Sequence, residues 1–408
     1  MSTETSTEVT TDDSVQQEQS VVSAVLRSII DSSWLVVLIA IVASLLLGGV
    51  LVVLANDSVA EAFGYFFSRP SDTFHAIGQV LGDTYAAMFK GAIYNTDAHT
   101  FGDAIKPITQ SATMATPLIF AGLGLGVGFR AGLFNIGAQG QIIIGATVGA
   151  FVGFTWDLPV GLHLVLAVLG TVLGGALWGF IPGVLKAATG AHEVIVTIML
   201  NYVALNLVSF LLSKDAFQVE GSDNPLAPAV GANAMYPKLL GNGYALHWGF
   251  VVALLAAVAV WWLMERSTWG LQFRAVGANA RAARTAGMSV GMSYVLVLVI
   301  AGALAGLAGS AQVLGTQPAL SSNVAASFGF DAITVALLGR SRPLGIVLAA
   351  LLFGALKASG PALQVQAHLP IDVVLVVQSL IVLFIAAPPL VRALVRLPKP
   401  RQVKEVTA

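Results

Sequence analysis

The chain has 408 residues, of which 56% are hydrophobic and only 10% are charged, and its mean hydropathy is +0.83. Soluble domains carry about a quarter charged residues, so this composition excludes an ordinary water-soluble protein. The chain contains no cysteine, which excludes disulfides, zinc-thiolate sites, iron–sulfur clusters and cysteine nucleophiles. The formal net charge of −1 decides little, because in a membrane protein the side on which each charge lies matters more than the total.

Continuous apolar runs dominate the chain after a polar start. Each run approaches the roughly 20 residues that an α-helix needs to cross the hydrocarbon core, whereas the strands of an outer-membrane barrel would alternate in short segments. The pattern predicts an all-α polytopic membrane protein. About ten transmembrane helices are expected, at residues 34–55, 108–128, 139–156, 161–182, 194–213, 247–264, 292–314, 325–339, 343–358 and 371–390.

The remaining segments complete the predicted organisation. Residues 1–30 are expected to form a disordered cytoplasmic tail without the features of a signal peptide, and residues 31–55 the first helix. Residues 56–107 are expected to be extracytoplasmic, with surface helices at 58–67 and 73–94, while 214–246 is rich in Pro, Gly and Asn and predicts a loop. The membrane-spanning core would be 108–390, followed by a basic cytoplasmic tail at 391–408. The short eighth helix predicts a re-entrant or broken helix near 316–339.

Lysine and arginine are distributed unevenly over the two sides that this helix count defines. With a cytoplasmic N-terminus, fourteen fall inside and five outside, and Lys357 lies near a helix end from which it is expected to snorkel outward. This is the positive-inside pattern, and it predicts that both chain ends are cytoplasmic. The inside set is Arg27, Arg130, Lys186, Arg266, Arg274, Arg281, Arg284, Arg340, Arg342, Arg392, Arg396, Lys399, Arg401 and Lys404; the outside set is Arg69, Lys90, Lys106, Lys214 and Lys238.

Glycines recur at four-residue spacing inside several apolar runs. Small residues at this spacing let helix backbones approach closely, so packing within the bundle is the main expectation and a dimerisation face the alternative. The glycines concerned are Gly145, Gly149 and Gly153; Gly170 and Gly174; Gly175 and Gly179; and Gly302 and Gly306. The run GLGLGVG at 122–128 does not match the spacing of a nucleotide-binding loop, and it predicts close packing or local unwinding.

The sequence offers no catalytic or metal-binding constellation. It contains neither a GxxxxGK[ST] phosphate loop nor an HExxH zinc motif, which predicts that the chain is not an enzyme and does not hydrolyse ATP by itself. Ionisable residues are scarce in the apolar runs. Asp331, Asp372 and Glu193, the last beside His192, lie near helix ends and are expected to be caps or interfacial anchors. Coupling of transport to protons or sodium ions needs ionisable residues within the membrane, and few are present here. The energy for any transport is therefore expected to come from another protein.

The stretch between the sixth and seventh helices predicts a short helix at 280–286. Asn279 would cap its start and Gly287 would end it. Its small residues, together with Arg281 and Arg284, suit docking into a groove of another protein. From the residues alone, an ordinary basic interfacial helix that satisfies the positive-inside rule is the favoured interpretation, and docking is the alternative.

Four segments resemble one family of permeases, those that import branched-chain amino acids, simple sugars and nucleosides. Residues 115–123 (ATPLIFAGL) with 129–141 (FRAGLFNIGAQGQ) are similar to its hallmark, and 190–202 (GAHEVIVTIMLNY) resembles the nucleoside branch, in which Asn often stands at the position of His192. Residues 274–288 resemble the ATPase-coupling segment and 329–340 (GFDAITVALLGR) is the fourth match. The resemblance covers about 108–390 and implies ATPase coupling through Gly277, Asn279, Arg281, Ala282, Arg284 and Gly287.

This resemblance implies an ATP-binding-cassette importer in the bacterial cytoplasmic membrane that moves nucleosides or related sugar-containing solutes by alternating access. The chain would pair with a second permease subunit, as a heterodimer, between cytoplasmic ATPases that bind ATP and Mg²⁺ and an extracytoplasmic solute-binding lipoprotein. It would hold no cofactor and bind no nucleic acid. The alternatives are a self-sufficient secondary carrier and, with no paired catalytic residues to support it, an intramembrane enzyme.

Neutral amides are the candidates for the solute path. Amides offer donors and acceptors to sugar hydroxyls or base edges, and an aromatic ring offers a stacking face, although amides that hold helices together would look the same. Asn201 and Asn206 are five residues apart and cannot share one narrow helix face. The predicted path residues are Phe134, Asn135, Gln139, Gln141, Asn201 and Asn206.

Overall fold

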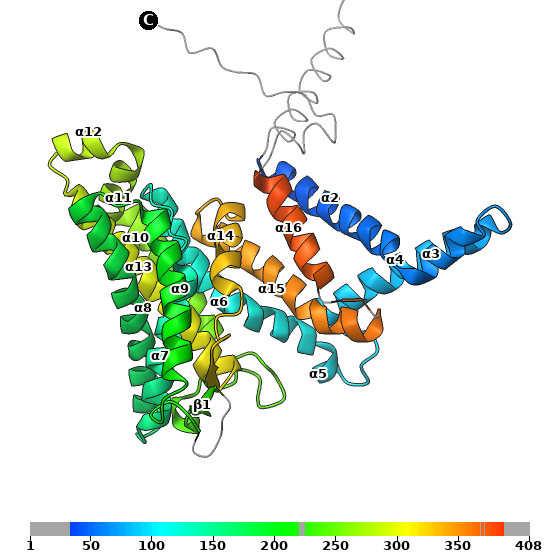
Figure 1. Ribbon diagram of the computed structural model, residues 1–408, viewed down its shortest axis with the longest axis horizontal. Helices are drawn as coiled ribbons and strands as arrows, with labels where there is room; N and C mark the ends of the chain where they lie inside the picture. The colour runs from blue at the N-terminus through cyan, green and yellow to red at the C-terminus, as the bar shows by residue number, and fades with distance from the viewer. Residues whose placement is uncertain (1–32, 220–224, 368, 371, 387–408) are drawn as a thin grey trace, which may run out of the picture. The chain divides into compact units, whose positions relative to one another are not determined.

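The computed structural model describes residues 33–219, 225–367, 369–370 and 372–386, and helices make up most of it (Figure 1). Each of the ten predicted membrane helices has a counterpart, so the all-α polytopic fold is confirmed. The predicted tails at 1–30 and 391–408 lie outside the described residues. The ten helices are α2 (Ser33–Leu54), α6 (Lys106–Arg130), α7 (Ala138–Thr155), α8 (Leu162–Thr189), α9 (Glu193–Leu211), α10 (Gly249–Arg266), α13 (Val290–Ala311), α14 (Phe328–Leu338), α15 (Pro343–Gln366) and α16 (Asp372–Ala386).

Not all ten helices are long enough to cross a bilayer alone. In the described part of the chain, seven are long and apolar enough, and an eighth span results if α2 and α3 (Asp57–Gly64), bent by 62°, count as one. The helix α14 has only 11 residues and follows an extended segment, as expected for a broken helix near 316–339. Ten is therefore an approximate count of crossings.

The described chain forms two compact units. One unit comprises the described residues up to 81 together with those from 375, and the other comprises residues 82–374. The helices α3 and α4 (Pro70–Ala92) correspond to the two helices predicted within 56–107, and a short α5 (Phe101–Ala104) follows them. Every residue with a predicted functional role lies in the second unit.

Helix α6 forms the centre of the second unit. It packs against α10, α13, α14 and α15, and 83% of its most apolar stretch is buried. The glycine run at 122–128 stays helical. A Cβ atom added at Gly124 would lie 2.9 Å from the backbone oxygen of Ala301 in α13. The run therefore serves close packing, one of its two predicted roles, and does not unwind.

Helices α7, α8 and α13 meet through glycine. A Cβ atom at Gly175 of α8 would collide with the backbone oxygen of Gly302 in α13, and one at Gly145 of α7 would lie 2.6 Å from the Cα atom of Gly306. A Cβ atom at Gly149 would collide with Thr171 of α8. The predicted packing role of these glycines within the bundle is confirmed, because only hydrogen fits at each contact.

The two ends of this unit differ (Figure 1). At one end lie α11 (Thr268–Ala278) and α12 (Ala280–Thr285). Asn279 caps α12 by accepting hydrogen bonds from two backbone N–H groups of its first turn, and Gly287 follows with φ +81°, so the short capped helix is confirmed. Helix α11 was not predicted. Its Gly277 lies directly against the backbone of Arg130 at the end of α6.

The opposite end carries a small cap built from two distant segments. Residues 225–248 are mostly irregular, as predicted, but β1 (Leu226–Ala229) pairs antiparallel with β2 (Ala319–Ser321), which the sequence did not indicate. The first segment also contains a 3₁₀ turn, η1 (Ala232–Ala234), and the second begins with a π-helical turn, η2 (Gln312–Thr316). The pairing fixes where the chain leaves β2 and enters the loop before α14.

Lys238 and His247 hold the cap onto the end of α13. The ammonium of Lys238 donates to the backbone oxygens of Gly315, at 3.0 Å, and Ala245, at 3.3 Å. The His247 ring stacks on Tyr236 with centroids 5.4 Å apart, and its Nδ1 accepts a hydrogen bond from the backbone N–H of Gly249. Burial, assisted by the nearby charge of Lys238, lowers the pKa of His247 to about 4. Burial also lowers the pKa of Lys238 and raises that of Tyr236 to about 12.

We expect Gly175→Ala to destabilise the protein by about 1–3 kcal/mol, because the added methyl group overpacks the contact between α8 and α13. The matched control is Gly78→Ala in α4, where a Cβ atom meets nothing within 4 Å and alanine favours the helix. Thermal unfolding of the detergent-solubilised protein measures both. Equal melting temperatures for the two variants would contradict the packing role.

We expect the stability of the protein to fall as the pH drops from about 6.5 to about 4. The folded pKa of His247 lies below its ordinary value, so the unfolded state binds the proton more tightly and the contribution, on the order of 3 kcal/mol, is complete only above the unfolded pKa. His247→Asn keeps an acceptor for Gly249 and should flatten this pH dependence. The exposed His192 provides the control His192→Asn, which should leave the slope as it is.

Candidate functional site

The turn between α6 and α7, residues 131–137, is held by buried amides. Asn135 has only 1% of its surface exposed. Its Nδ2 donates to Oε1 of Gln141 at 3.1 Å, and its Oδ1 accepts the backbone N–H of Gly137 at 2.9 Å. A buried turn needs such partners, because its polar groups cannot reach water and lipid cannot supply hydrogen bonds. The two amides therefore stabilise the start of α7.

Asn201 of α9 completes the anchoring of this turn. Its Oδ1 accepts the backbone N–H of Gly140 at 2.8 Å, and its Nδ2 donates to the backbone oxygen of Ile136 at 2.9 Å. The Asn201 side chain thus provides hydrogen-bond partners for one backbone N–H and one backbone C=O group around the start of α7. Gly140 allows this approach, since a Cβ atom there would lie 3.0 Å from Oδ1 of Asn201. One amide fastens α9 to the N-terminus of α7.

Gln139 ties the same turn to the loop before α14. Its Nε2 donates to the backbone oxygen of Ala326 at 2.6 Å, and its Oε1 accepts the backbone N–H of Gly329 at 2.9 Å. Ala326 has φ +41°, a left-handed conformation that is unfavourable for alanine. The amide of Gln139 therefore holds a strained loop in place across almost 190 residues of sequence.

A cavity of about 360 Å³ lies where these three elements meet. This volume falls within the range typical of small-molecule pockets. All of its lining residues are uncharged. They come from the start of α7, from α9 and from the loop preceding and entering α14: Ile136, Gln139, Ile143, Ile198, Asn201, Tyr202, Leu205, Ser322, Asn323, Ala325, Ala326 and Phe330.

Two of the six predicted path residues, Gln139 and Asn201, line this cavity. Asn135 and Gln141 are buried behind it. Phe134 is 39% exposed and stacks on Phe129 with centroids 5.0 Å apart. The amide of Asn206 donates to the backbone oxygen one turn earlier in α9, at 2.8 Å. The structure thus brings Asn135, Gln139, Gln141 and Asn201 together around the turn, and places Phe134 and Asn206 outside the cavity lining.

An ion pair lies behind the loop, within the apolar helices. Nζ of Lys357 in α15 is 2.7 Å from Oδ2 of Asp331 in α14 and 3.0 Å from Oγ of Ser327, and that hydroxyl donates to the same carboxylate oxygen at 2.7 Å. The side chains of Lys357 and Asp331 are only 17% and 19% exposed. The predicted outward snorkelling of Lys357 is wrong, because α15 continues to Gln366 and the ammonium turns toward the loop.

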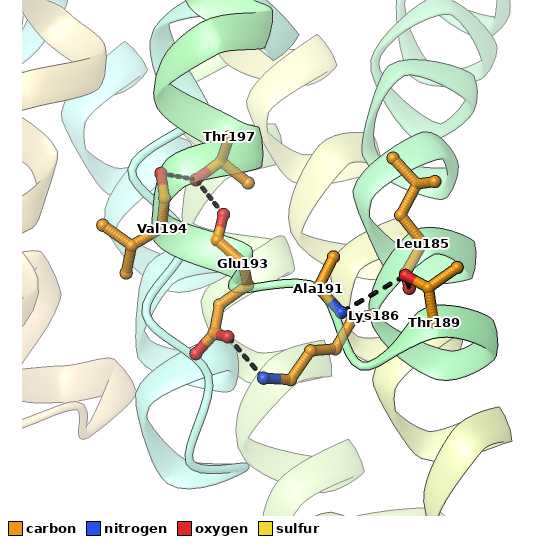
Figure 2. Close-up of polar contacts among 7 residues, drawn as sticks. All are labelled: Leu185, Lys186, Thr189, Ala191, Glu193, Val194 and Thr197. Atoms are coloured by element: carbon orange, nitrogen blue, oxygen red, sulfur yellow. Dashed lines mark hydrogen bonds and ion pairs between the residues drawn. The ribbon is translucent and has the colours of Figure 1, made fainter.

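A second ion pair closes the link between α8 and α9 (Figure 2). Nζ of Lys186, in the last turn of α8, is 2.7 Å from Oε2 of Glu193, which opens α9 as expected of an anchor. Gly190 ends α8 in the left-handed conformation, with φ +71°. The linker is therefore fixed at the end of the bundle that also carries α12.

Helix α12 presents its two arginines at this end. Arg281 and Arg284 are exposed, and no ion pair joins either to an acid in the described part of the chain. Together with Lys186 and Tyr294 they line a hollow of about 340 Å³ between α12, α8 and α13. Val276, Ala283 and Val290 pack beneath. The helix thus stands on an apolar base and offers a positive outer surface.

Comparison with known proteins decides the family. Residues 108–386 match the family described as branched-chain amino acid transport system / permease component, which is well over half of the chain. The chain belongs to this permease family. No solved structure matches it.

Three curated relatives are similar to this permease over most of their length. The guanosine ABC transporter permease protein NupP of Bacillus subtilis is 38% identical over 76% of this chain and 87% of NupP. The nucleoside ABC transporter permease protein NupB of Lactococcus lactis is 33% identical over 91% and 94%. The glucose ABC transporter permease protein TsgB13 of Haloferax volcanii is 35% identical over 74% and 80%. The chain is thus a permease subunit of ABC transporter type.

Sequence reasoning missed the cavity residues contributed by the permease's second half. Ser322 and Asn323 lie in a polar break between two apolar runs, and Phe330 lies in the first turn of the short helix that follows. The signal that could have found them is the polar break itself, since irregular backbone at membrane depth is tolerated where it lines a cavity. A second signal was Lys357, because a charged residue within an apolar helix indicates a partner or a functional site nearby.

We expect Lys357→Met to destabilise the permease by roughly 3 kcal/mol, because it leaves the carboxylate of Asp331 buried without its partner. The double variant Lys357→Met/Asp331→Asn should recover most of this loss in thermal unfolding measurements. The exposed pair of Lys106 and Asp103 is the control, and Lys106→Met should leave the melting temperature unchanged. No recovery in the double variant would show that the charge pair is not what stabilises the loop.

Proposed function

We propose that this permease imports nucleosides across a bacterial cytoplasmic membrane, as one of two homologous permease subunits. Cytoplasmic ATPases that bind ATP and Mg²⁺ drive it, and an extracytoplasmic lipoprotein delivers the solute. The observation that carries the proposal is the uncharged cavity between α7, α9 and the loop before α14, in a chain similar to relatives named for guanosine and nucleosides.

The lining of the cavity favours a neutral solute over an amino acid. A zwitterionic amino acid would bring an ammonium and a carboxylate into the membrane domain, and both need charged or strongly polar partners there. The twelve lining residues carry no charge. A nucleoside is uncharged at neutral pH and has hydroxyls and a base edge that amides and hydroxyls can satisfy.

The side of the cavity formed by α9 supports a second permease subunit. Large apolar side chains of α9 beyond the cavity lining are widely exposed in this chain: Ile195, Met199, Val203 and Phe210. A solute path needs a wall opposite this face, because a neutral polar solute would otherwise meet lipid. We assign that wall to the second permease, and α9 is the helix that it would contact.

Helix α12 is the proposed contact for the ATPase. It is short, capped by Asn279, seated on an apolar base and positively charged on its outer surface, which suits insertion into a groove of a partner. Gly287 follows it with φ +81° and lets the chain turn, and Gly277 in the preceding α11 lies directly against the backbone of α6. An ATPase that binds the inward- and outward-facing states with different affinity would shift the balance between them through this helix.

Uptake into proteoliposomes tests the function. The assembled importer should accumulate radiolabelled guanosine or another nucleoside only with ATP, Mg²⁺ and the binding lipoprotein. Accumulation driven by an ion gradient without ATP would support the secondary carrier instead. Uptake of free glucose with no nucleoside uptake would assign the chain to the sugar branch.

We expect the double variant Arg281→Glu/Arg284→Glu to lose ATP-driven uptake by at least about tenfold, since like charges across an interface cost several kcal/mol. ATP hydrolysis should lose its dependence on the loaded binding protein. The matched control is Arg266→Glu, an exposed arginine at the same end but outside α12, which should transport normally. Normal uptake by the double variant would overturn the assignment of α12.

A further inference from the structure

We propose that Asn323 reads the edge of the nucleobase in this permease, in the cavity that the rings of Tyr202 and Phe330 also line, while Gln139 and Asn201 only hold the cavity in shape. This inference rests on the proposed nucleoside function and names the residues that recognise the solute. It follows from which polar groups around the cavity are already engaged and which remain available.

The two predicted amides in the lining are already occupied. Both ends of the Gln139 amide bind backbone groups of the loop, at 2.6 and 2.9 Å. Both ends of the Asn201 amide bind backbone groups around the α6–α7 turn, at 2.9 and 2.8 Å. A solute that took these hydrogen bonds would leave their backbone partners unpaired, among them the N–H of the buried Gly140, which is costly. These amides therefore set the geometry and do not select the solute.

Asn323 is the available amide. It lies between β2 and α14 and is exposed, and its side-chain amide makes no hydrogen bond to any described residue. An amide presents a donor and an acceptor side by side, which is the pattern that lets Asn pair with two adjacent atoms of a base edge. Its neighbour Ser322 adds a hydroxyl to the same wall. No other unpaired amide lines the cavity within the described chain.

Two aromatic rings enter the cavity from different helices. Tyr202 comes from α9 and Phe330 from α14, and they are 62% and 48% exposed. Aromatic side chains exposed in a cavity offer faces on which a flat base can stack, whichever base it is. A free sugar has no aromatic ring, so it lacks the π-stacking that a base gains on these rings. The rings therefore predict a preference for nucleosides over their sugars, and the amide of Asn323 discriminates among bases.

The loop that carries Asn323 is anchored by side chains of two helices, α7 and α15. Gln139 fixes Ala326 and Gly329 from α7, and Lys357 fixes Ser327 and Asp331 from α15. Asn323 itself lies three residues before the strained Ala326, whose N–H donates to the Asn323 backbone oxygen at 2.9 Å. A recognition group on an anchored loop loses little entropy when the solute arrives.

The test is the maximal uptake rate of the assembled importer in proteoliposomes, with saturating binding protein and solute. Saturation matters because the lipoprotein would set the half-saturating concentration, so a contact within the permease shows in the maximal rate. The probes are guanosine, adenosine, cytidine and ribose. The variants are Asn323→Leu, Asn323→Gln, Phe330→Leu and Phe330→Tyr, and the control is Asn206→Leu, whose amide is engaged within α9 outside the cavity.

Asn323→Leu should lower nucleoside uptake roughly two- to tenfold, the effect of one lost hydrogen bond, and should change the ratio of guanosine to adenosine rates. Asn323→Gln, which keeps an amide, should retain most of the rate. Phe330→Leu should slow all three nucleosides similarly, whereas Phe330→Tyr keeps the ring and should transport well. Asn206→Leu should behave as the unchanged protein does.

Three results would overturn the inference. The first is an unchanged rate and an unchanged base preference in Asn323→Leu. The second is a fall in the melting temperature of that variant with unchanged base preference, since Asn323 would then be structural. The third is an unmodified importer that moves none of the nucleosides, which removes the proposed function as well and is thereby distinguished from the first two.

Discussion

The close approach of α8 to α13 is the contact on which the remaining architecture depends. Gly175 and Gly302 place the two backbones so near each other that no Cβ atom fits between them. In lipid, helices gain no hydrophobic advantage by associating, so van der Waals packing at such contacts must hold the bundle together. The same device joins α7 through Gly145 and Gly149, and α6 through Gly124. These contacts fix the rigid frame against which the irregular segments are placed.

Within this frame the irregular backbone is supported by side-chain amides. The turn after α6 and the loop before α14 leave N–H and C=O groups without partners in regular secondary structure, and each such group needs a partner when it is buried. Asn201 and Gln139 supply these partners from other segments. The amides that shape the cavity, Gln139 and Asn201, are therefore different from the amide of Asn323, which stays available to a solute. The sequence motif around the α6–α7 turn does not by itself reveal this difference.

The charges divide into two kinds with different physical roles. Most basic residues of this unit lie at the end that carries α12, where an exposed arginine is hydrated or meets a partner. Lys357 and Asp331 lie instead behind the cavity loop and neutralise each other at 2.7 Å. A lone charge there would be costly, whereas a hydrogen-bonded pair can be kept as a rigid link between α14 and α15. The basic residues at the α12 end thus relate to the orientation of the protein in the membrane, whereas the pair of Lys357 and Asp331 fixes the loop before α14.

The sequence by itself determined the membrane class, the position of every long helix, the capped helix after Asn279 and the packing role of the glycines. Each of these follows from local properties, namely the length of an apolar run, a capping residue or a four-residue spacing. It also indicated Gln139 and Asn201 as neighbours of a polar site. Only the tertiary structure decided that β1 pairs with β2, that Lys357 meets Asp331, and that Asn323 and Phe330 share a cavity with Tyr202. These contacts join residues far apart in the chain, and no local pattern specifies which distant segment satisfies a given polar group.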